Sequence, residues 1–536
     1  MMTRQIAVAG MLGLWFIFAC STVNSTSGPP LAKTQFVPPP EGPRLIVLIS
    51  DLHMGIGQKK KDVWYETEDF RWNRALKGFL DEMSSRGNDT VDLIIAGDFL
   101  ELWQPPESVT CTGVSEDLGC TVEEMRQITK VIVEAHKQEM ADLKDFSNKG
   151  ENRLHIIPGN HDAALLLADV WEIMAEALDA KSGRVNFVEN GVWVSPDGRI
   201  IVEHGHQIGR DVNRFLDWPT IVRWNAATEK YYLIRPWGEN FVQKIFNDVE
   251  RDYQLIDNLS PESAGIRYRM ADRSMWETAE DVANFLAFNL FETSINQKVA
   301  LLGPETADTP TWDVAVGREL GYKLFANALD PQDPFRMSLL ENDAIAESMR
   351  KTLDQIARDP NKIFDADVSM YCSLIAIQRE KLKGTDKAKW ETCETPELGG
   401  MIEALVYSKE AVLRKHLKAI RGQHPDMSVF IYGHTHQLEE RWRLALEKDD
   451  SVSVLNSGAF QRLIDEAGFL ERVKADPSIA SPAEGFKAMP LDALAPCYTF
   501  VMVPYEDGKP EPKTQQWHMP ENRPGQIVNP GNRICE

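Results

Sequence analysis

The fold of this chain is constrained most by its short β-branched runs. Most of these runs end in polar or glycine residues. Runs of this length and composition indicate buried β-strands. Apolar residues at helical spacing lie between several of them, at Asn73–Met83 and Glu403–Ile420. Strands that alternate with helices predict an α/β fold. The seven runs are Arg44–Ser50, Val91–Gly97, Arg153–Gly159, Arg199–Gly205, Ser428–Gly433, Ser451–Gly458 and Tyr498–Tyr505.

Metal-ligating residue types follow five of these strands. Loops at the carboxyl ends of strands form the active sites of α/β folds, so we expect these side chains to converge. Asp, Asn and His suit Mn, Fe, Zn or similar ions. Taken alone, the two histidines of GHTH would also fit a polar surface turn, so the inference depends on the whole set. Its members are Asp51, His53, Asp98, Asn160, His161, Asp162, His204, His206, His434 and His436.

The ordered motifs DLH, GD, GNHD, HGH and GHTH resemble the signature of the calcineurin-like metallophosphoesterases, over about residues 44–205 and 426–462. The resemblance implies an α/β fold built as a four-layer α/β/β/α sandwich, with two divalent metal ions at one edge. It also implies the ligands. One ion would be held by Asp51, His53 and His436, and the other by Asn160, His204 and His434, with Asp98 bridging them.

The same resemblance implies a hydrolase of phosphomonoesters or phosphodiesters that uses a metal-bound hydroxide. A two-metal clamp stabilises the attacking and leaving oxygens of an in-line displacement. In the family, the histidine at the position of His161 contacts the phosphoryl group and protonates the leaving group. Asp162 would orient it, as carboxylates commonly orient histidines. The alternative for His161 is a structural turn residue. His204, which directly precedes Gly205, is the predicted ligand, and His206 would support it from outside.

A long stretch, residues 207–425, separates the fourth motif from the fifth and lacks repeated β-branched runs. Thr278–Phe291 opens with a capping-box pattern and continues with an apolar face, and Ala344–Ala357 is similar. We therefore predict a mostly helical insertion between two parts of the core, at 44–206 and 426–536. Aromatic residues near its start, from Trp218 to Phe241, are more typical of core than of a substrate pocket.

Two further residues leave other functions open. Glu101 and Trp103, after the GD motif, resemble the UDP-2,3-diacylglucosamine pyrophosphatases, although that subgroup has GNRD where this chain has GNHD. One alternative is therefore a pyrophosphatase that acts on nucleotide-sugar or lipid-linked substrates. A second is a non-catalytic envelope protein that binds a ligand. The complete ligand set and His161 argue against this second alternative.

The N-terminal segment favours export. One positive charge precedes an apolar stretch, Ile6–Cys20, which is too short for a comfortable membrane span and suits a secretory signal. Its end, "IFAC" followed by "ST", resembles the lipobox of bacterial lipoproteins. That resemblance implies a signal at 1–20, lipidation of Cys20 and a cell-envelope protein held at the membrane. Residues 21–43 would be a Ser/Thr/Pro-rich tether. An ordinary cleaved signal and an uncleaved anchor are the alternatives.

The remaining cysteines indicate the compartment of the protein, and the net charge indicates which kinds of partner it can bind. Six cysteines form sequence-local pairs, Cys111 with Cys120, Cys372 with Cys393 and Cys497 with Cys535. They predict three disulfides in an oxidising compartment, with six free thiols as the alternative. Acids outnumber bases by 81 to 58, for a formal charge of -23. Nucleic-acid-binding surfaces are basic, so we expect a small phosphorylated substrate and no nucleic acid.

Overall fold

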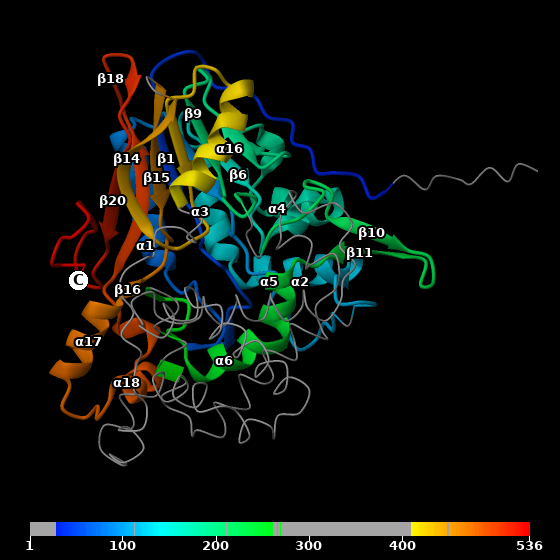
Figure 1. Ribbon diagram of the computed structural model, residues 1–536, viewed down its shortest axis with the longest axis vertical. Helices are drawn as coiled ribbons and strands as arrows, with labels where there is room; N and C mark the ends of the chain where they lie inside the picture. Colours follow the sequence, from blue (N-terminus) through cyan, green and yellow to red (C-terminus); the bar gives the residue numbers. More distant parts are fainter. Residues whose placement is uncertain are drawn as a thin grey trace, which may run out of the picture.

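Two β-sheets carry the loops of interest (Figure 1). The computed structural model describes residues 28–260 apart from 112 and 210–212, residues 265 and 268–269, and residues 409–535 apart from 448–449. The larger sheet has the order β21 (Gln526–Val528), β20 (Lys513–His518), β17 (Cys497–Val503), β1 (Leu45–Ile49), β4 (Val91–Ala96), β6 (Arg153–Ile157), β7 (Val185–Phe187). The smaller sheet has the order β14 (Leu438–Glu447), β15 (Asp450–Ser457), β13 (Val429–Tyr432), β9 (Ile200–Glu203), β8 (Val192–Val194).

Helices connect the parallel strands β1, β4, β6 and β7. They are α1 (Asn73–Arg86), α2 (Val122–Ala135), α3 (Lys137–Asn148) and α4 (Ala168–Ala177). Helix α1 buries Leu76, Phe79, Leu80 and Met83, which recur at helical spacing on one face. Parallel strands need such crossovers, and their carboxyl ends therefore lie at the same edge of the sheet.

The smaller sheet joins two distant parts of the chain. β9 and β13 are parallel neighbours, with Val429 opposite Ile200. The chain therefore leaves this sheet after β9 and returns at β13 after the insertion. Helix α16 (Lys409–Gln423) leads into β13, and its Leu413 and Leu417 belong to the same buried cluster as Phe430.

Strand β1 explains why most of the predicted strands are largely apolar. Its Ile46 and Leu48 lie in a buried cluster with residues of the other sheet, such as Val202. Its Val47 and Ile49 lie in a second cluster with helix residues such as Phe79. Side chains alternate along a strand, so a strand covered on both faces must be apolar at every position. The seven strands and the α/β architecture predicted from the sequence are confirmed; the four-layer order stays a prediction.

The described start of the insertion contains strands that the sequence did not suggest. β10 (Val222–Asn225) and β11 (Lys230–Ile234) form a hairpin that pairs with β5 (Leu118–Thr121) and extends to one side of the molecule (Figure 1). The hairpin forms because β-prone aromatic residues flank an Asx turn, in which Asn225 Oδ1 accepts hydrogen bonds from two backbone N–H groups. Tyr232 and Trp237 are buried, whereas Trp224 is exposed.

Short elements complete the described insertion and the C-terminal part of the core. They include α5 (Trp237–Phe241), a π-helical turn (Val242–Phe246), α6 (Asn247–Asp252), β12 (Leu259–Ser260), β16 (Ile464–Asp465), α17 (Glu466–Ala475), α18 (Pro482–Ala488), β18 (Tyr505–Glu506) and β19 (Lys509–Pro510). β12 pairs with β16, which attaches the end of this segment to the core. The helices predicted at 278–291 and 344–357 lie outside the described residues.

Part of the predicted tether lies against the core. The Ala32 N–H donates to Leu166 O at 2.8 Å, the Ala168 N–H to Pro30 O at 2.9 Å, and the Val37 N–H to Gly183 O at 3.0 Å. Residues 30–37 are therefore hydrogen-bonded to the core, and this part of the predicted tether is not a free linker. The predicted signal segment lies outside the described ranges. Within those ranges, no helix is both long and apolar enough to cross a bilayer.

Two of the three predicted disulfides are formed, Cys111–Cys120 and Cys497–Cys535. Cys372 and Cys393 lie outside the described residues. We expect non-reducing peptide mass mapping of the protein to recover all three pairs, because each is local in sequence. Free thiols at Cys372 and Cys393 in unreduced protein would contradict the third pair.

Candidate metal centre

The predicted ligands follow strands β1, β4, β6, β9 and β13 and meet at one edge of the two sheets. Five of them have backbone φ angles in the left-handed region. Residues other than glycine avoid this region because of steric strain, so such outliers cluster where the surrounding structure holds a side chain in a functional position. The five are Asp51 (φ 54°), His53 (φ 51°), Asp98 (φ 49°), His434 (φ 73°) and His436 (φ 54°).

The glycines of the motifs make room for ligands from neighbouring strands. A Cβ atom on Gly97 would lie 2.3 Å from Cγ of His204, and one on Gly159 would lie 2.1 Å from Oδ1 of Asp98. Glycine is therefore required at these positions, because only hydrogen occupies the space that the ligand needs.

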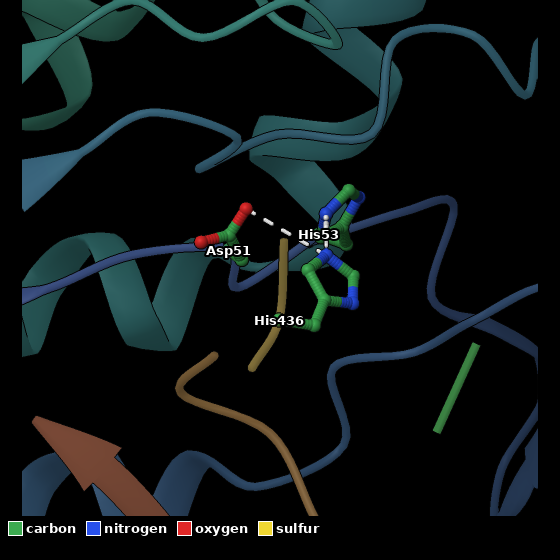
Figure 2. A group of neighbouring side chains, drawn as sticks. All are labelled: Asp51, His53 and His436. Atoms are coloured by element: carbon green, nitrogen blue, oxygen red, sulfur yellow. Dashed lines mark hydrogen bonds and ion pairs between the residues drawn. The ribbon is translucent and has the colours of Figure 1, made fainter. Parts of the chain in front are cut away.

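Asp51, His53 and His436 form a first group of donor atoms, all within 4.8 Å of one another. Figure 2 shows their side chains turned toward a common point. Nε2 of His53 lies 3.2 Å from Nε2 of His436, which lies 3.6 Å from Oδ1 of Asp51. Asp51 Oδ2 accepts the His434 N–H at 3.0 Å, while the buried Oδ1 accepts no hydrogen bond. That oxygen is therefore available to a cation.

Asp98, His204 and His434 form a second group, also within 4.8 Å. Asn160 belongs beside it, because its Oδ1 lies 3.0 Å from Nε2 of His204. Asp98 Oδ2 is 3.0 Å from His204 Nε2 and 3.8 Å from His53 Nε2. Its other oxygen accepts the His161 N–H at 2.9 Å. A single carboxylate oxygen therefore faces both groups.

Hydrogen bonds fix the tautomers of two of the histidines. His204 Nδ1 donates to the Ala96 carbonyl at 2.8 Å, and His53 Nδ1 donates to Glu101 Oε2 at 2.9 Å. Each bond leaves an Nε2 lone pair directed into the groups, as in metal-ligating histidines. Burial lowers the pKa of His204, but the Asp98 charge outweighs it and raises the pKa to about 9. The site thus attracts positive charge, and its donors fit divalent metal ions.

His161 lies at the rim of these groups, with 16% of its side chain exposed. Its Nδ1 is 2.6 Å from Glu101 Oε2, and its ring stacks on Trp103 at 3.9 Å between centroids. Burial raises the pKa of Glu101, but the charges and hydrogen bonds of His161 and His53 outweigh it and lower the pKa to about 2. Glu101 is therefore a buried anion that holds two histidines at once.

The structure corrects the proposed partner of His161. The Asp162 carboxylate accepts three backbone N–H groups, from Gly159 at 2.6 Å, Phe99 at 2.8 Å and Leu100 at 3.3 Å. It therefore ties the GNHD loop to the GD loop, and Glu101 takes the orienting position. Consecutive residues point in different directions, so adjacency in sequence misled the prediction. The available signal was a carboxylate three residues after Asp98.

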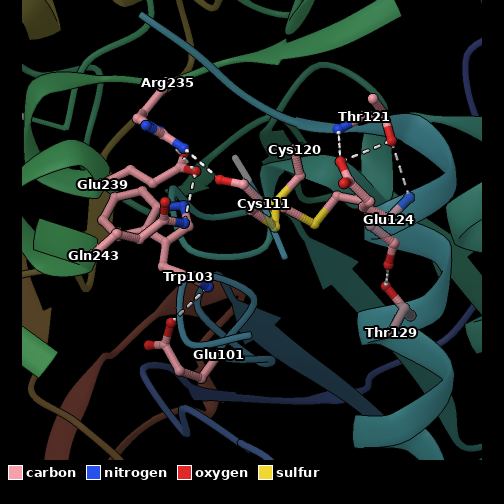
Figure 3. Close-up of a disulfide and its surroundings, with 11 residues drawn as sticks. Glu101, Trp103, Cys111, Cys120, Thr121, Glu124, Thr129, Arg235, Glu239 and Gln243 are labelled. Atoms are coloured by element: carbon pink, nitrogen blue, oxygen red, sulfur yellow. Dashed lines mark hydrogen bonds and ion pairs between the residues drawn. A yellow bond between two sulfur atoms is a disulfide. The ribbon is translucent and has the colours of Figure 1, made fainter. Parts of the chain in front are cut away.

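The disulfide Cys111–Cys120 and residues of the insertion lie in the surroundings of Glu101 and Trp103 (Figure 3). Glu101 Oε1 accepts the Trp103 N–H at 2.9 Å. Beyond Trp103, Arg235 Nη2 donates to the carbonyl of Cys111 at 3.5 Å and its Nε lies 3.6 Å from Glu239 Oε1. The insertion therefore contacts the loop that carries the disulfide next to the site.

Two other residues help to shape the site. His206 is buried, and its ring packs edge-on against Trp218 at 4.6 Å between centroids, outside both donor groups. Asn456, which is not among the site residues predicted from the sequence, donates to Gly433 O at 2.9 Å and to Thr435 Oγ1 at 3.0 Å. It therefore fixes the GHTH loop from the neighbouring strand β15.

Comparison with known families agrees with this geometry. The model of the calcineurin-like phosphoesterase family matches residues 44–289. This part of the chain belongs to the metallophosphoesterase superfamily. As a calcineurin-like phosphoesterase it is a metal-dependent hydrolase of phosphoric esters, and its family binds divalent metals. No curated protein matches the chain. The match includes the first four motifs, whereas the GHTH loop of this phosphoesterase lies beyond it.

Glu101 should matter to both metal binding and catalysis in this phosphoesterase. We expect Glu101→Gln to lower kcat/KM about 10–100-fold and to weaken metal binding, because the amide removes the charge that orients His53 and His161. Metal analysis and kinetics at saturating Mn²⁺ would measure both effects. Glu107→Gln, an exposed residue on the same loop, is the matched control. Unchanged activity and metal content in Glu101→Gln would contradict the role.

Proposed function

We propose that this protein hydrolyses phosphomonoesters or phosphodiesters at a dinuclear metal centre. The observation that carries the proposal is the single oxygen, Asp98 Oδ2, that faces both donor groups. Asp51, His53 and His436 would hold one ion, and Asn160, His204 and His434 the other. When bound, the two ions would supply an ionised water near neutral pH and neutralise charge on the phosphoryl oxygens.

The chain's own residues would complete the reaction. His161 contacts Glu101 through Nδ1, so its Nε2 remains available to the substrate. There it would donate a proton to the leaving oxygen, as a positioned general acid does. Glu101 Oε2 would orient the imidazole through its contact with Nδ1, and Trp103, on which the ring stacks, would limit the ring to one plane. Asp162 holds the backbone on which His161 is presented.

A pyrophosphatase is the second candidate, because the wall next to His161 is largely apolar. A small hollow there is lined by residues that include Met125, Phe215, Ile221 and Leu233. An apolar wall beside a phosphoryl site fits a substrate with an apolar group near the scissile bond, as in lipid-linked pyrophosphates.

A substrate panel tests these candidates. The chelated protein would be reloaded separately with Mn²⁺, Fe²⁺, Zn²⁺ and Co²⁺ and assayed on a nitrophenyl monoester, a bis-nitrophenyl diester and a nucleotide-sugar pyrophosphate. We expect metal-dependent hydrolysis of a monoester or diester. Hydrolysis of the pyrophosphate alone would support the second candidate. Protein that holds two ions per chain and hydrolyses none of the substrates would instead be a binding protein.

Export and lipid anchoring complete the proposal. The two disulfides among the described residues support an oxidising compartment. If Cys20 carries the lipid, Cys20→Ser should move the protein from the membrane fraction to the soluble fraction and abolish labelling with a fatty-acid probe. Labelling and membrane association equal to those of the unmodified protein would contradict the anchor.

A further inference from the structure

A second cluster of carboxylates lies outside the candidate metal centre. Oxygens of Asp69, Glu250 and Asp257 all lie within 4.8 Å of one another. They come from three segments: the loop before α1, helix α6 and the turn that leads to β12. Asp69 is 4% exposed and Glu250 is 1% exposed, while Asp257 is half-buried. Like charges are thus brought together away from water.

Such an arrangement needs a compensating charge. Burying carboxylates without a partner is costly, and they either take up a proton or bind a cation. Burial raises the pKa of Asp69 to about 7 and the pKa of Glu250 well above its ordinary value, and the neighbouring acids add to both shifts. Among the described residues, no ion pair within 4.0 Å joins Asp69 or Glu250 to a lysine, arginine or histidine, although the charges of His53 and Arg71 oppose the rise in the pKa of Asp69.

An independent observation points to a ligand. Gln104, on the loop after β4, donates from Nε2 to Glu250 Oε2 at 2.7 Å, which places its amide at the cluster. The side chain is 6% exposed, and its carbonyl oxygen Oε1 has no hydrogen-bond partner. Glu250 Oε1 is buried in the same way without a donor. Buried acceptors without donors are rare in folded proteins and require an explanation.

We propose that Asp69, Glu250 and Asp257, together with the carbonyl of Gln104, bind a third divalent cation, of the hard type represented by Ca²⁺. The donors are all oxygens from carboxylates and an amide, without the histidines that mark the dinuclear centre. Ligands from three separate segments form a flexible site, which suits Ca²⁺ better than the strict octahedron of Mg²⁺. Asp257 also lines a surface hollow with Thr435, His436 and Gln437, through which an ion would reach the cluster.

The position of this site would tie the insertion to the catalytic loops. Gln104 directly follows Trp103, on which His161 stacks. Asp69 directly follows Glu68, whose carboxylate accepts the N–H groups of Gly55 at 3.2 Å and Gly57 at 2.5 Å, just after His53. A cation here would therefore hold α6 against the loops that carry the metal ligands and the proton donor.

Equilibrium dialysis of the full chain with ⁴⁵Ca²⁺, after loading with Mn²⁺, tests the proposal. We expect one Ca²⁺ per chain in the unmodified protein and at least a tenfold weaker affinity in Asp69→Asn and Glu250→Gln. Asp248→Asn, an exposed residue of the same helix, is the matched control and should bind Ca²⁺ normally. Asp98→Asn should also keep its Ca²⁺, which separates this site from the dinuclear centre.

Thermal unfolding is a second test. A cation site and a merely buried acidic cluster predict different changes in the Tm of the neutral variants. Ca²⁺ should raise the Tm of the unmodified protein and of Asp248→Asn, and not that of Asp69→Asn or Glu250→Gln. A merely buried acidic cluster predicts that these neutral variants are more stable than the unmodified protein whether or not Ca²⁺ is present. Asp257→Asn, at the half-buried position, serves if the other two variants do not fold. Absence of Ca²⁺ binding by the unmodified protein, or equal binding by the folded variants, would overturn the proposal.

Discussion

Replacing Asp98 with asparagine should remove almost all phosphoester hydrolysis and lower the metal content of the protein. Asp98 Oδ2 faces both donor groups, at 3.0 Å from His204 Nε2 and 3.8 Å from His53 Nε2. An amide keeps the shape of the side chain and removes the negative charge on which both ions depend. The loss should exceed the about 10²–10⁴-fold effect of removing a general acid alone.

Metal analysis and kinetics on the same preparation would check this result. Asp81→Asn, on the exposed face of α1, is a suitable control for a generic loss of one carboxylate. The Asp98→Asn protein should remain folded, because the His161 N–H that bonds to Asp98 Oδ1 can also bond to the amide oxygen. Full activity at equal metal content would show that Asp98 is not a shared ligand.

Most of the strands could be predicted from the sequence because strands covered on both faces are largely apolar. β1 shows this, since its alternate residues enter two different buried clusters. The hairpin of β10 and β11 could not be predicted in the same way. It is a half-exposed element, in which Trp224 faces solvent and Tyr232 is buried. Its residues therefore lack the continuous apolar pattern of a core strand.

The donor groups could be predicted because strand order in an α/β fold brings the ends of parallel strands together, whatever their separation in sequence. The contacts of His161 could not be predicted from the sequence. Its neighbour in sequence, Asp162, turns toward the backbone of Gly159 and Phe99, while Glu101 arrives from another loop. Such a pairing depends on tertiary packing, which a motif does not encode.

Replacing His161 with alanine should separate chemistry from metal binding. The imidazole lies at the rim of the donor groups, where its Nδ1 contacts Glu101 and its ring packs edge-on against the His53 ring at 4.6 Å between centroids. We therefore expect an about 10²–10⁴-fold loss of activity, typical for a positioned proton donor, with the metal content unchanged. The loss should be smaller for a nitrophenyl ester than for an alkyl ester, because a good leaving group needs less protonation.

The double variant His161→Ala, Glu101→Gln distinguishes the two tasks of Glu101. If Glu101 acted only through His161, adding Glu101→Gln to His161→Ala would cost nothing further. Because Glu101 also holds His53 at 2.9 Å, we expect a further loss that appears together with weaker metal binding.

Equal losses of the single variant His161→Ala for good and poor leaving groups would instead assign His161 to phosphate positioning. Loss of metal in His161→Ala alone would make it a ligand or a structural support, and its role as proton donor would be wrong.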